Sequence, residues 1–343
     1  MPSGESTEDV MAEEKTDGED YGMAGPLDNE GQESLVSHRV LLDLNAGCPW
    51  DGLNYSCAYD VVYMVFYAMY GTSSRAWRTL WTSESPEWNR LLANQFDLLL
   101  DNNTSGPHHL QISPQLFATY RNSFRIEVAK SDPQTFPRGR RFAPVGPMLE
   151  RILGHSVVPY VSQALQCNGC DARSSPIRFS LPYIGFAATL DRLRLDSDPE
   201  FIPLSVVLTR FIQRYSIAPL ERHRECNACL SARRVESLSL PEASWIWFEQ
   251  TPNAQWLQPS LAISCRQPPG LKPTHTLAAI IYLGMDHFTA RIRKDENTWW
   301  AYDSQRRNGT PQVVALANEA ELRTFETRLM AYIIYRRCDN GGA

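Results

Sequence analysis

Apolar residues in the first part of the chain recur at the spacing of α-helices. Downstream of Cys57 this stripe consists of Val61, Val62, Val65, Phe66 and Met69. Steps of three and four residues place these side chains on one side of a helix, which we expect to open at Ser56-Cys57, with Ser56 as its N-cap, and to stop at Gly71. Apolar stripes that begin near a proline or glycine predict further helices over 86–100, 114–124 and 146–153. The region 45–155 is therefore predicted to be mainly helical.

After Gly154 the pattern changes to short runs that are typical of strands. These runs are rich in β-branched and aromatic residues, lie between turn residues, and cover 157–165, 177–181, 244–249, 261–265, 276–283, 288–293 and 298–302. The segment 203–215 fits a strand or a helix, 40–44 alternates weakly and is a candidate lead-in strand, and 321–335 has helical periodicity. Helices first and strands later predict an α+β fold rather than an alternating parallel α/β fold.

The N-terminal segment differs from the rest in charge and in apolar content. Residues 1–35 contain eleven acidic side chains against Lys15 alone, a net charge of −10, so the remainder carries −6 + 10 = +4. A Gly- and Ser-rich acidic segment with few large apolar side chains cannot bury enough surface to offset its ordering entropy. We therefore predict a disordered acidic tail over 1–38, which acts as a solvated spacer in preference to an arm that docks on a basic partner.

Composition also limits the compartment and the partners. With 43% apolar and 21% charged residues, the chain has the composition of a soluble globular protein. It contains no run of 18 apolar residues and no secretory signal, so we expect a cytoplasmic or nuclear protein without a membrane partner. Structural disulfides are rare in those compartments, and the eight cysteines need another role. The modest body charge, without a basic-aromatic patch, argues against nucleic-acid binding.

Four of the cysteines form two Cys-x-x-Cys pairs. One pair is Cys167 with Cys170, and the other is Cys226 with Cys229, roughly 55 residues further on. Four thiolates supplied by two such turns suit a tetrahedral structural Zn²⁺. We therefore predict these four residues as zinc ligands, in preference to a redox pair.

Cys57 is the candidate nucleophile. A cysteine attacks as a thiolate, and a helix N-terminus together with a neighbouring imidazolium supplies the field that lowers a thiol pKa. Cys57 stands at a predicted helix start, behind the turn-rich segment 48–52. This position is also that of an ordinary core cysteine, so the prediction depends on finding a base. Asp60, one turn further on, suits a helix N-terminus but opposes thiolate formation, and we interpret it as structural.

The candidate base and acid lie far downstream of the nucleophile. His287 directly precedes the strand 288–293, and Asp303 directly follows the Trp-rich strand 298–302. The polar turn 294–297 joins these strands into a predicted hairpin, with His287 near the start of one strand and Asp303 at the end of its neighbour. A carboxylate at that point can accept the imidazole N–H, select the tautomer and stabilise the imidazolium. We therefore predict a catalytic triad of Cys57, His287 and Asp303.

The order of these features resembles that of ubiquitin-specific proteases. The segment 287–303, with its His-aromatic-Thr-Ala strand and its Trp-rich strand ending in Asp, is similar to the family's His box, and the block around Cys57 is similar to its Cys box. The sequence Cys57-Ala58-Tyr59-Asp60 also resembles the Cys-x-x-Asp helix start of the divergent SUMO-directed isopeptidases. In the family a zinc ribbon lies between the two boxes, and the resemblance here covers about 45–310.

The resemblance implies a papain-like cysteine protease fold with three parts. These are a helical thumb with the catalytic cysteine over 39–155, zinc-binding fingers over 156–240, and a β-rich palm with the catalytic histidine and aspartate over 241–343. It further implies a thiol-dependent hydrolase that cleaves isopeptide bonds at the C-terminus of ubiquitin or a ubiquitin-like modifier. The implied partners are conjugates of such modifiers, and the implied cofactor is structural Zn²⁺.

The Cys box departs from the family at the oxyanion hole. The family places an asparagine five residues before the nucleophile, where this chain has Gly52. The N–H of Cys57 remains as one donor, and Asn54 or a main-chain amide is left as the second, since Asp51 is an anion. This departure favours a rival hypothesis, a weak or inactive module that binds ubiquitin or a ubiquitin-like protein on the same fold. The intact Cys, His and Asp set favours the enzyme.

Overall fold

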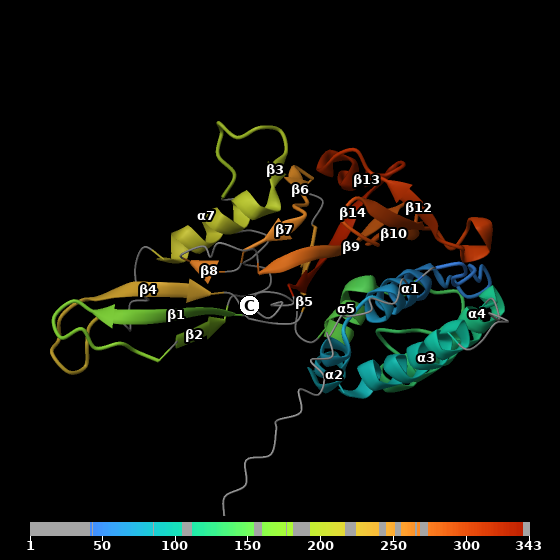
Figure 1. Cartoon of the computed structure of the whole chain (residues 1–343), viewed down its shortest axis with the longest axis horizontal. Coiled ribbons are helices and arrows are strands. Elements are labelled where there is room, and N and C mark those ends of the chain that lie inside the picture. Colours follow the sequence, from blue (N-terminus) through green and yellow to red (C-terminus); the bar gives the residue numbers. More distant parts are fainter. Residues whose placement is uncertain are drawn as a thin grey trace, which may run out of the picture. The chain divides into compact units, whose positions relative to one another are not determined.

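The computed structural model divides the chain into two units, Met1–His38 and Arg39–Ala343. It describes residues 42, 44–84, 86–104, 112–153, 160–175, 177–180, 193–216, 224–239, 245–250, 255–264, 266–267 and 274–338. The predicted tail over 1–38 and most of the candidate lead-in strand over 40–44 lie outside these residues. Figure 1 labels most of the helices and strands.

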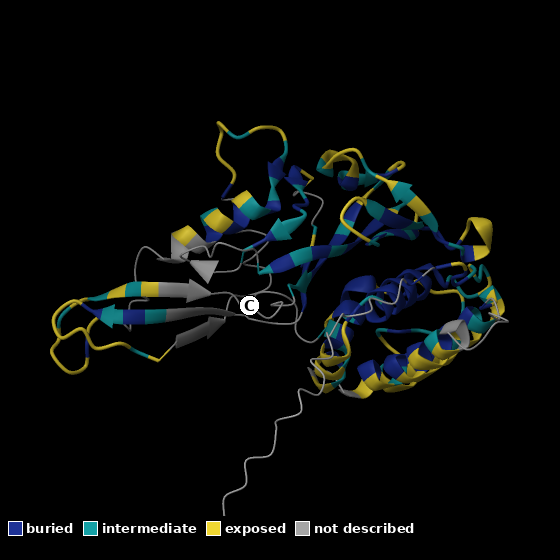
Figure 2. Cartoon of the chain, in the orientation of Figure 1, coloured by how far each residue is buried: buried dark blue, intermediate teal, exposed yellow. Residues whose placement is uncertain are grey.

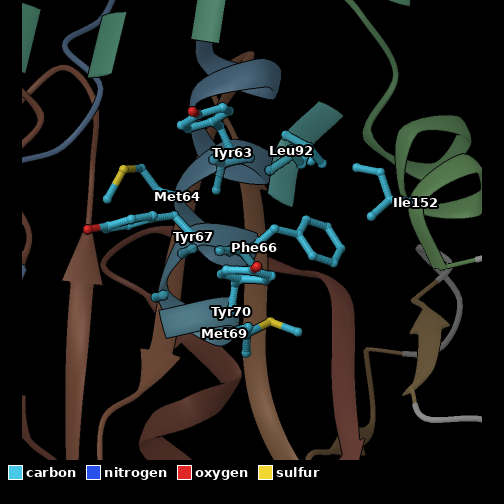
Figure 3. Close-up of a cluster of buried hydrophobic side chains, with 14 of the residues drawn as sticks. Tyr63, Met64, Phe66, Tyr67, Met69, Tyr70, Leu92 and Ile152 are labelled. Carbon is cyan, nitrogen blue, oxygen red and sulfur yellow. The ribbon is translucent and has the colours of Figure 1, made fainter. Parts of the chain in front are cut away.

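One buried helix forms the centre of the helical part. The helices described there are α1 (Cys57–Gly71), α2 (Arg75–Glu84), α3 (Pro86–Thr104), α4 (Pro114–Ser131) and α5 (Val145–Leu153). All 15 residues of α1 are buried, as expected for a helix that is apolar on every side. Its aromatic and methionine side chains gather with Leu92 of α3 and Ile152 of α5 (Figure 3). Figure 2 shows the contrast with α3 and α4, which carry exposed residues along one side.

A mainly antiparallel sheet supports α1. Its strands follow the order β12 (Gln312–Ala315), β11 (Thr298–Tyr302), β10 (His287–Arg293), β9 (His275–Gly284), β14 (Arg328–Arg337) and β13 (Thr324–Phe325), with β5 (Trp245–Glu249) paired to β14 and β7 (Ala262–Ile263) paired to β9. α1 packs against β10 and β9. Ala290, Ile292 and Trp300 join the helical core. Tyr282 and Trp299 belong to a second core, shared with α7 (Leu204–Ser216) and the 3₁₀ helix η4 (Glu319–Arg323).

A second sheet carries the cysteine pairs. Its order is β2 (Ile177–Ser180), β1 (Tyr160–Cys167), β4 (Arg233–Ser239) and β8 (Arg266–Gln267). β1 and β4 are antiparallel, and Cys167 at the end of β1 pairs with Arg233 at the start of β4. This register brings the turns before β4 and after β1 to the same end of the sheet. A separate parallel pair consists of β3 (Ile202–Pro203) and β6 (Leu257–Gln258).

Most of the predicted elements are present, and several others are corrected, among them β4, which was not predicted. The ambiguous segment 203–215 is largely helix α7, and α2 was not predicted. The helix predicted over 321–335 is wrong, because these residues form η4, β13 and β14. β14 lies between β9 and β5 and is buried from Tyr332 to Tyr335, so it lacks the alternation of a half-exposed strand. Ser56 precedes α1, but its side chain makes no capping hydrogen bond. Among the described helices none is long and apolar enough to cross a membrane.

Candidate active site

The hairpin of β10 and β11 brings His287 and Asp303 together, which confirms the predicted hairpin. The register pairs Ala290 with Tyr302, so both residues lie at the same end of the two strands. Nε2 of His287 lies 2.7 Å from Oδ1 of Asp303, and both side chains are buried. Nδ1 of His287 is buried too and has no hydrogen-bond partner among the described residues. When the N–H of Nε2 donates a hydrogen bond to the carboxylate, Nδ1 carries no proton and can accept one from another group.

Asp303 is held as a carboxylate by several donors. Its Oδ1 also accepts a hydrogen bond of 3.0 Å from the backbone N–H of Gln305. Its Oδ2 lies 3.5 Å from Nε of Arg306 and 3.7 Å from Nη2 of Arg328. Burial acts to raise the pKa of Asp303, but the hydrogen bonds from His287 and Gln305 and the charge of Arg328 outweigh it and lower the pKa. The carboxylate is therefore ionised at neutral pH and can stabilise a protonated imidazole.

A tight turn precedes His287. Gly284 pairs with His287 across β9 and β10, so that only Met285 and Asp286 form the loop. Both have positive φ, at 52° and 55°, as a two-residue turn of the type I′ class requires. Because such a turn reverses the chain within two residues, it places His287 at the first position of its strand. Both turn residues are exposed.

Cys57 is the first residue of α1 and is buried. Burial raises the pKa of its thiol, and the negative charge of Asp286 adds to the effect. Hydrogen bonding from the backbone N–H groups of Phe288, Ala58 and Cys57 itself acts in the opposite direction. The helix α1, which begins at Cys57, packs against β10, which begins at His287. The thiol is protonated at neutral pH and needs a base to become a nucleophile.

A buried network fixes the loop in front of Cys57. The Ser56 hydroxyl accepts a hydrogen bond of 2.7 Å from the backbone N–H of Asp51 and donates one of 2.7 Å to Oδ2 of Asp60. Arg121 of α4 forms an ion pair with Oδ1 of Asp60 and lies 3.4 Å from the backbone oxygen of Pro49. The side chains of Asp60 and Arg121 are 0% and 2% exposed. The network therefore links both ends of the loop to one buried charge pair, in agreement with a structural role for Asp60.

The same loop is tied to the sheet beyond Asp303. The hydroxyl of Tyr302 donates a hydrogen bond of 2.7 Å to the backbone oxygen of Cys48. The backbone N–H of Trp50 donates one of 3.0 Å to the backbone oxygen of Ser304. Gly309 has a φ of +75°, and a Cβ at this residue would lie 2.1 Å from the Cys48 oxygen. Only glycine permits so close an approach of the two backbones. The nucleophile loop and the segment after Asp303 are thus held together at several points.

Asn54, the candidate oxyanion donor, is bound to Asp51. Nδ2 of Asn54 donates to Oδ2 of Asp51 at 2.6 Å, and the backbone N–H of Leu53 donates to Oδ1 at 3.0 Å. Slight burial acts to raise the pKa of Asp51, but these hydrogen bonds lower it, so the carboxylate is ionised. One amide hydrogen of Asn54 is therefore already in use. At Gly52, the position of the family's asparagine, an added Cβ would meet the ring of Trp50 at 3.0 Å.

The four predicted zinc ligands lie together at the end of the second sheet. Their sulfur atoms all lie within 4.8 Å of one another, with 3.4 Å between Cys167 and Cys229 and 3.8 Å between Cys170 and Cys226. Tetrahedral Zn²⁺ with bonds of about 2.3 Å separates its sulfur ligands by about 3.8 Å, so the four residues fit such an ion. Hydrogen bonding from the amides of Ala228 and Cys229 lowers the pKa of Cys226 to about 6. This cluster could bind a metal.

Sequence reasoning missed two contributors to the site. Arg121 carried a detectable signal, because it lies at helical spacing between Phe117 and Phe124, a charge within an apolar stripe. Asp286 carried no such signal, because it stands in the turn before His287 and not in a patterned helix or strand. The turn residues do not follow the alternation of a strand, and Asp286 acts on the pKa of Cys57.

Solved structures with a similar chain path include members of two groups of proteins. The Ubp8-containing DUB module of SAGA bound to ubiquitin aldehyde is 11% identical, with 89% of this chain and 71% of that chain covered and a TM-score of 0.38. The Pan2 catalytic unit of Neurospora crassa, with protease and nuclease domains, is 10% identical over 86% of this chain and 57% of that chain, with a TM-score of 0.39. The Saccharomyces cerevisiae PAN2 pseudoubiquitin-hydrolase–RNase module is 9% identical over 87% and 54%, with a TM-score of 0.39.

These likenesses do not decide the function. The TM-scores lie below 0.5, too low for the likeness to indicate a shared function. No protein-family model matches the chain, and no curated protein matches it in sequence. The function must therefore be argued from the residues of the site itself.

Proposed function

We propose that the protein is a cysteine hydrolase that cleaves isopeptide bonds at the C-terminus of ubiquitin or a ubiquitin-like modifier. The observation that carries the proposal is the 2.7 Å contact between His287 and Asp303, at the start of the strand β10 that packs against α1, the helix whose first residue is Cys57. The resemblance of the two boxes to ubiquitin-specific proteases supports the substrate class. In this proposal the thumb is 39–155, the fingers are 156–240 and the palm is 241–343.

The proposed reaction has two halves, the acylation and the deacylation of Cys57. His287 takes the proton of the Cys57 thiol at Nδ1, and the sulfur attacks the carbonyl carbon of the modifier's C-terminal glycine. Asp303 stabilises the imidazolium that results. The imidazolium then gives this proton to the lysine nitrogen as the C–N bond breaks, which leaves a thioester on Cys57. Water, deprotonated by His287, attacks the thioester carbon, and the carboxylate product and the thiol are released.

The oxyanion and the metal have supporting roles in this proposal. The backbone N–H of Cys57 is one donor to the developing oxyanion, and the second hydrogen of Asn54 or a main-chain amide is the other. Zn²⁺ would be held by the four clustered cysteines, where it would cross-link two turns of the fingers and take no part in bond cleavage. A cross-linked turn pair would keep the end of the second sheet rigid for contact with a folded modifier.

A panel of modifier probes tests the proposal. Ubiquitin, SUMO and other ubiquitin-like proteins, each with a thiol-reactive group at its C-terminus, are incubated with the full chain. We expect one class of probe to couple to the unmutated chain and to Cys338→Ser, which serves as a matched cysteine control. The same probe should not couple to Cys57→Ser. An alcohol is not ionised by an imidazole in the way a thiol is. Failure of every probe, or coupling that persists in Cys57→Ser, contradicts the proposal.

A binding module without turnover is the second candidate. It is favoured by one observation: Asn54 is engaged with Asp51, while Gly52 stands where the family has its asparagine donor. Such a module would bind a modifier but would not couple to its probe. Calorimetric titration with the unmodified modifiers separates the two candidates, because an enzyme gives binding and coupling, and a binding module gives binding alone.

A further inference from the structure

Three arginines are exposed on the loop between α4 and α5. Arg138, Arg140 and Arg141 have exposed side chains, and Phe142, which follows them, is 55% exposed. None of the three guanidinium groups forms a hydrogen bond or an ion pair with any part of the chain that the structure describes. An aromatic ring beside three such cations is typical of a surface that binds a partner.

The loop has a defined conformation. Phe136 and Ala143 are buried at its two ends, with Phe136 against the ring of Trp88 at 5.4 Å. Gly139 lies between them with a φ of +79°, and its backbone oxygen accepts a hydrogen bond of 3.0 Å from Nη2 of Arg125 on α4. The arginines are therefore displayed from a built turn, so less entropy is lost when a partner orders their side chains.

The arginine loop contacts the segment that carries the nucleophile. The ring of Phe142 stacks on that of Tyr55, with centroids 5.0 Å apart and an angle of 20° between the planes. Tyr55 lies two residues before Cys57 and has a φ of +46°. Arg125, which holds the loop, also lies over the ring of Tyr59 in α1, at 5.1 Å. A ligand on the arginine loop would therefore lie close to the approach to Cys57.

Two carboxylates on adjoining segments, Asp132 after α4 and Asp51 on the nucleophile loop, are already bound. Asp132 accepts a hydrogen bond of 3.0 Å from the backbone N–H of Thr135 and lies 3.8 Å from Arg151. Asp51 accepts from Asn54 and Leu53. Neither carboxylate is paired with an arginine of the loop. The positive charge of the loop is therefore open to a partner of opposite charge.

We propose that Arg138, Arg140, Arg141 and Phe142 form a docking surface for an acidic stretch of a protein partner. That this partner is part of the conjugate cleaved at Cys57 rests on the proposed function, whereas its acidic character rests on the arginine loop alone. Guanidinium groups bind carboxylates through paired hydrogen bonds, and an acidic stretch supplies several carboxylates in sequence. Docking beside the nucleophile would hold a conjugate while its isopeptide bond enters the site.

A protein ligand fits this surface better than a nucleic acid does. Proteins that bind single strands stack bases on open aromatic faces along a basic groove. Here one ring is exposed within the arginine loop, and one of its faces is covered by Tyr55. The three cations also lie within four consecutive residues, so they form a compact patch and not a groove that follows a backbone.

Fluorescence anisotropy with the full chain carrying Cys57→Ala tests the surface without catalysis. The probe is a labelled peptide of about ten residues rich in Asp and Glu, long enough when extended to cover the loop, and its control is the same peptide with Asn and Gln. We expect the acidic peptide to bind and the neutral one not to bind. R140E/R141E should weaken binding by about tenfold or more, and R140Q/R141Q by less. The matched control is R75E/R90E, which changes the net charge equally at exposed arginines of α2 and α3 and should change affinity by less than about twofold.

Each outcome has a distinct reading. Equal losses in the two charge-reversed variants, or equal binding of acidic and neutral peptides, overturns the docking surface. So does an oligonucleotide that binds as tightly as the peptide and depends on the same arginines. If R140E/R141E does not fold, the glutamine variant decides the question. If modifier probes couple to the Cys57-intact chain and the peptide does not bind, the docking surface fails alone. If the peptide binds and no probe couples, the proposed function fails and the surface stands.

Discussion

The buried ion pair between Asp60 and Arg121 leads to a sharp prediction for stability. Arg121→Met keeps most of the aliphatic volume of the side chain and removes its charge. Asp60 is then left as a buried carboxylate with the Ser56 hydroxyl as a remaining donor. Loss of one partner from a buried pair lowers the free energy of unfolding by about 3–5 kcal/mol. That is a large share of the roughly 5–15 kcal/mol that holds a typical domain folded.

An exposed pair on the same helix provides the control. Lys130 and Glu127 of α4 lie 2.7 Å apart, but their side chains are 59% and 48% exposed. Lys130→Met should therefore lower the free energy of unfolding by less than about 1 kcal/mol, because water screens the pair. Asp60→Asn combined with Arg121→Met removes both charges, and we expect it to be more stable than Arg121→Met alone.

Urea unfolding followed by circular dichroism measures these differences. At about 2 °C per kcal/mol for a domain of this size, thermal melting should show a fall of roughly 6–10 °C for Arg121→Met. Equal stability of Arg121→Met and Lys130→Met would refute the reasoning, and so would a double variant that is less stable than Arg121→Met.

Four further predictions concern the site, the metal and the tail. Asp286→Asn removes a negative charge that raises the pKa of Cys57, so the pKa of Cys57 should fall. Alkylation of Cys57, followed by mass spectrometry of the Cys57 peptide, should then have a pH profile shifted to lower pH, and an unshifted midpoint contradicts this. Because Asn54 is bound to Asp51, Asn54→Ala should have a kcat within a few fold of that of the unmutated chain. A fall in kcat of about a hundredfold at constant KM would instead make Asn54 the oxyanion donor. Elemental analysis of protein purified under reducing conditions should find about one Zn²⁺ per chain, and protein without zinc would contradict the proposed zinc site. A chelator should loosen the four-cysteine cluster before it affects the triad. Deletion of residues 1–35 should leave melting temperature and activity nearly unchanged, since the segment has few apolar side chains to bury, and a large fall in melting temperature would contradict it.

The parts of the site that depend on neighbouring residues could be predicted from the sequence. The hairpin that joins His287 to Asp303 is local, because alternation defines both strands and a four-residue polar turn links them. The start of α1 at Cys57 follows from the helical spacing behind it. The two cysteine pairs also predicted their own cluster, since the pairing of two strands is enough to bring their turns together.

A local pattern was misleading where a strand is buried on both faces. Residues 321–335 have helical spacing, and the turn before β14 contains Glu326 with a φ of +56° in place of the glycine or asparagine that would mark it. Only the insertion of β14 between β9 and β5 explains why this apolar run is extended. Backbone hydrogen bonds to two neighbours stabilise the strand against the helix that its spacing alone favours.

The sequence by itself determined which residues could do the chemistry and which local elements carry them, because periodicity and turn chemistry act over a few residues. The tertiary structure decided which of these side chains are free to act. Asp60 and Arg121 are 61 residues apart, and they meet because α4 packs against α1. The pKa of Cys57 is raised in part by the charge of Asp286, which lies at a turn 229 residues away along the chain, and the two are brought into one region because β10 packs on α1. Such contacts depend on how the surfaces of whole helices and strands fit together, and no short window of sequence contains that information.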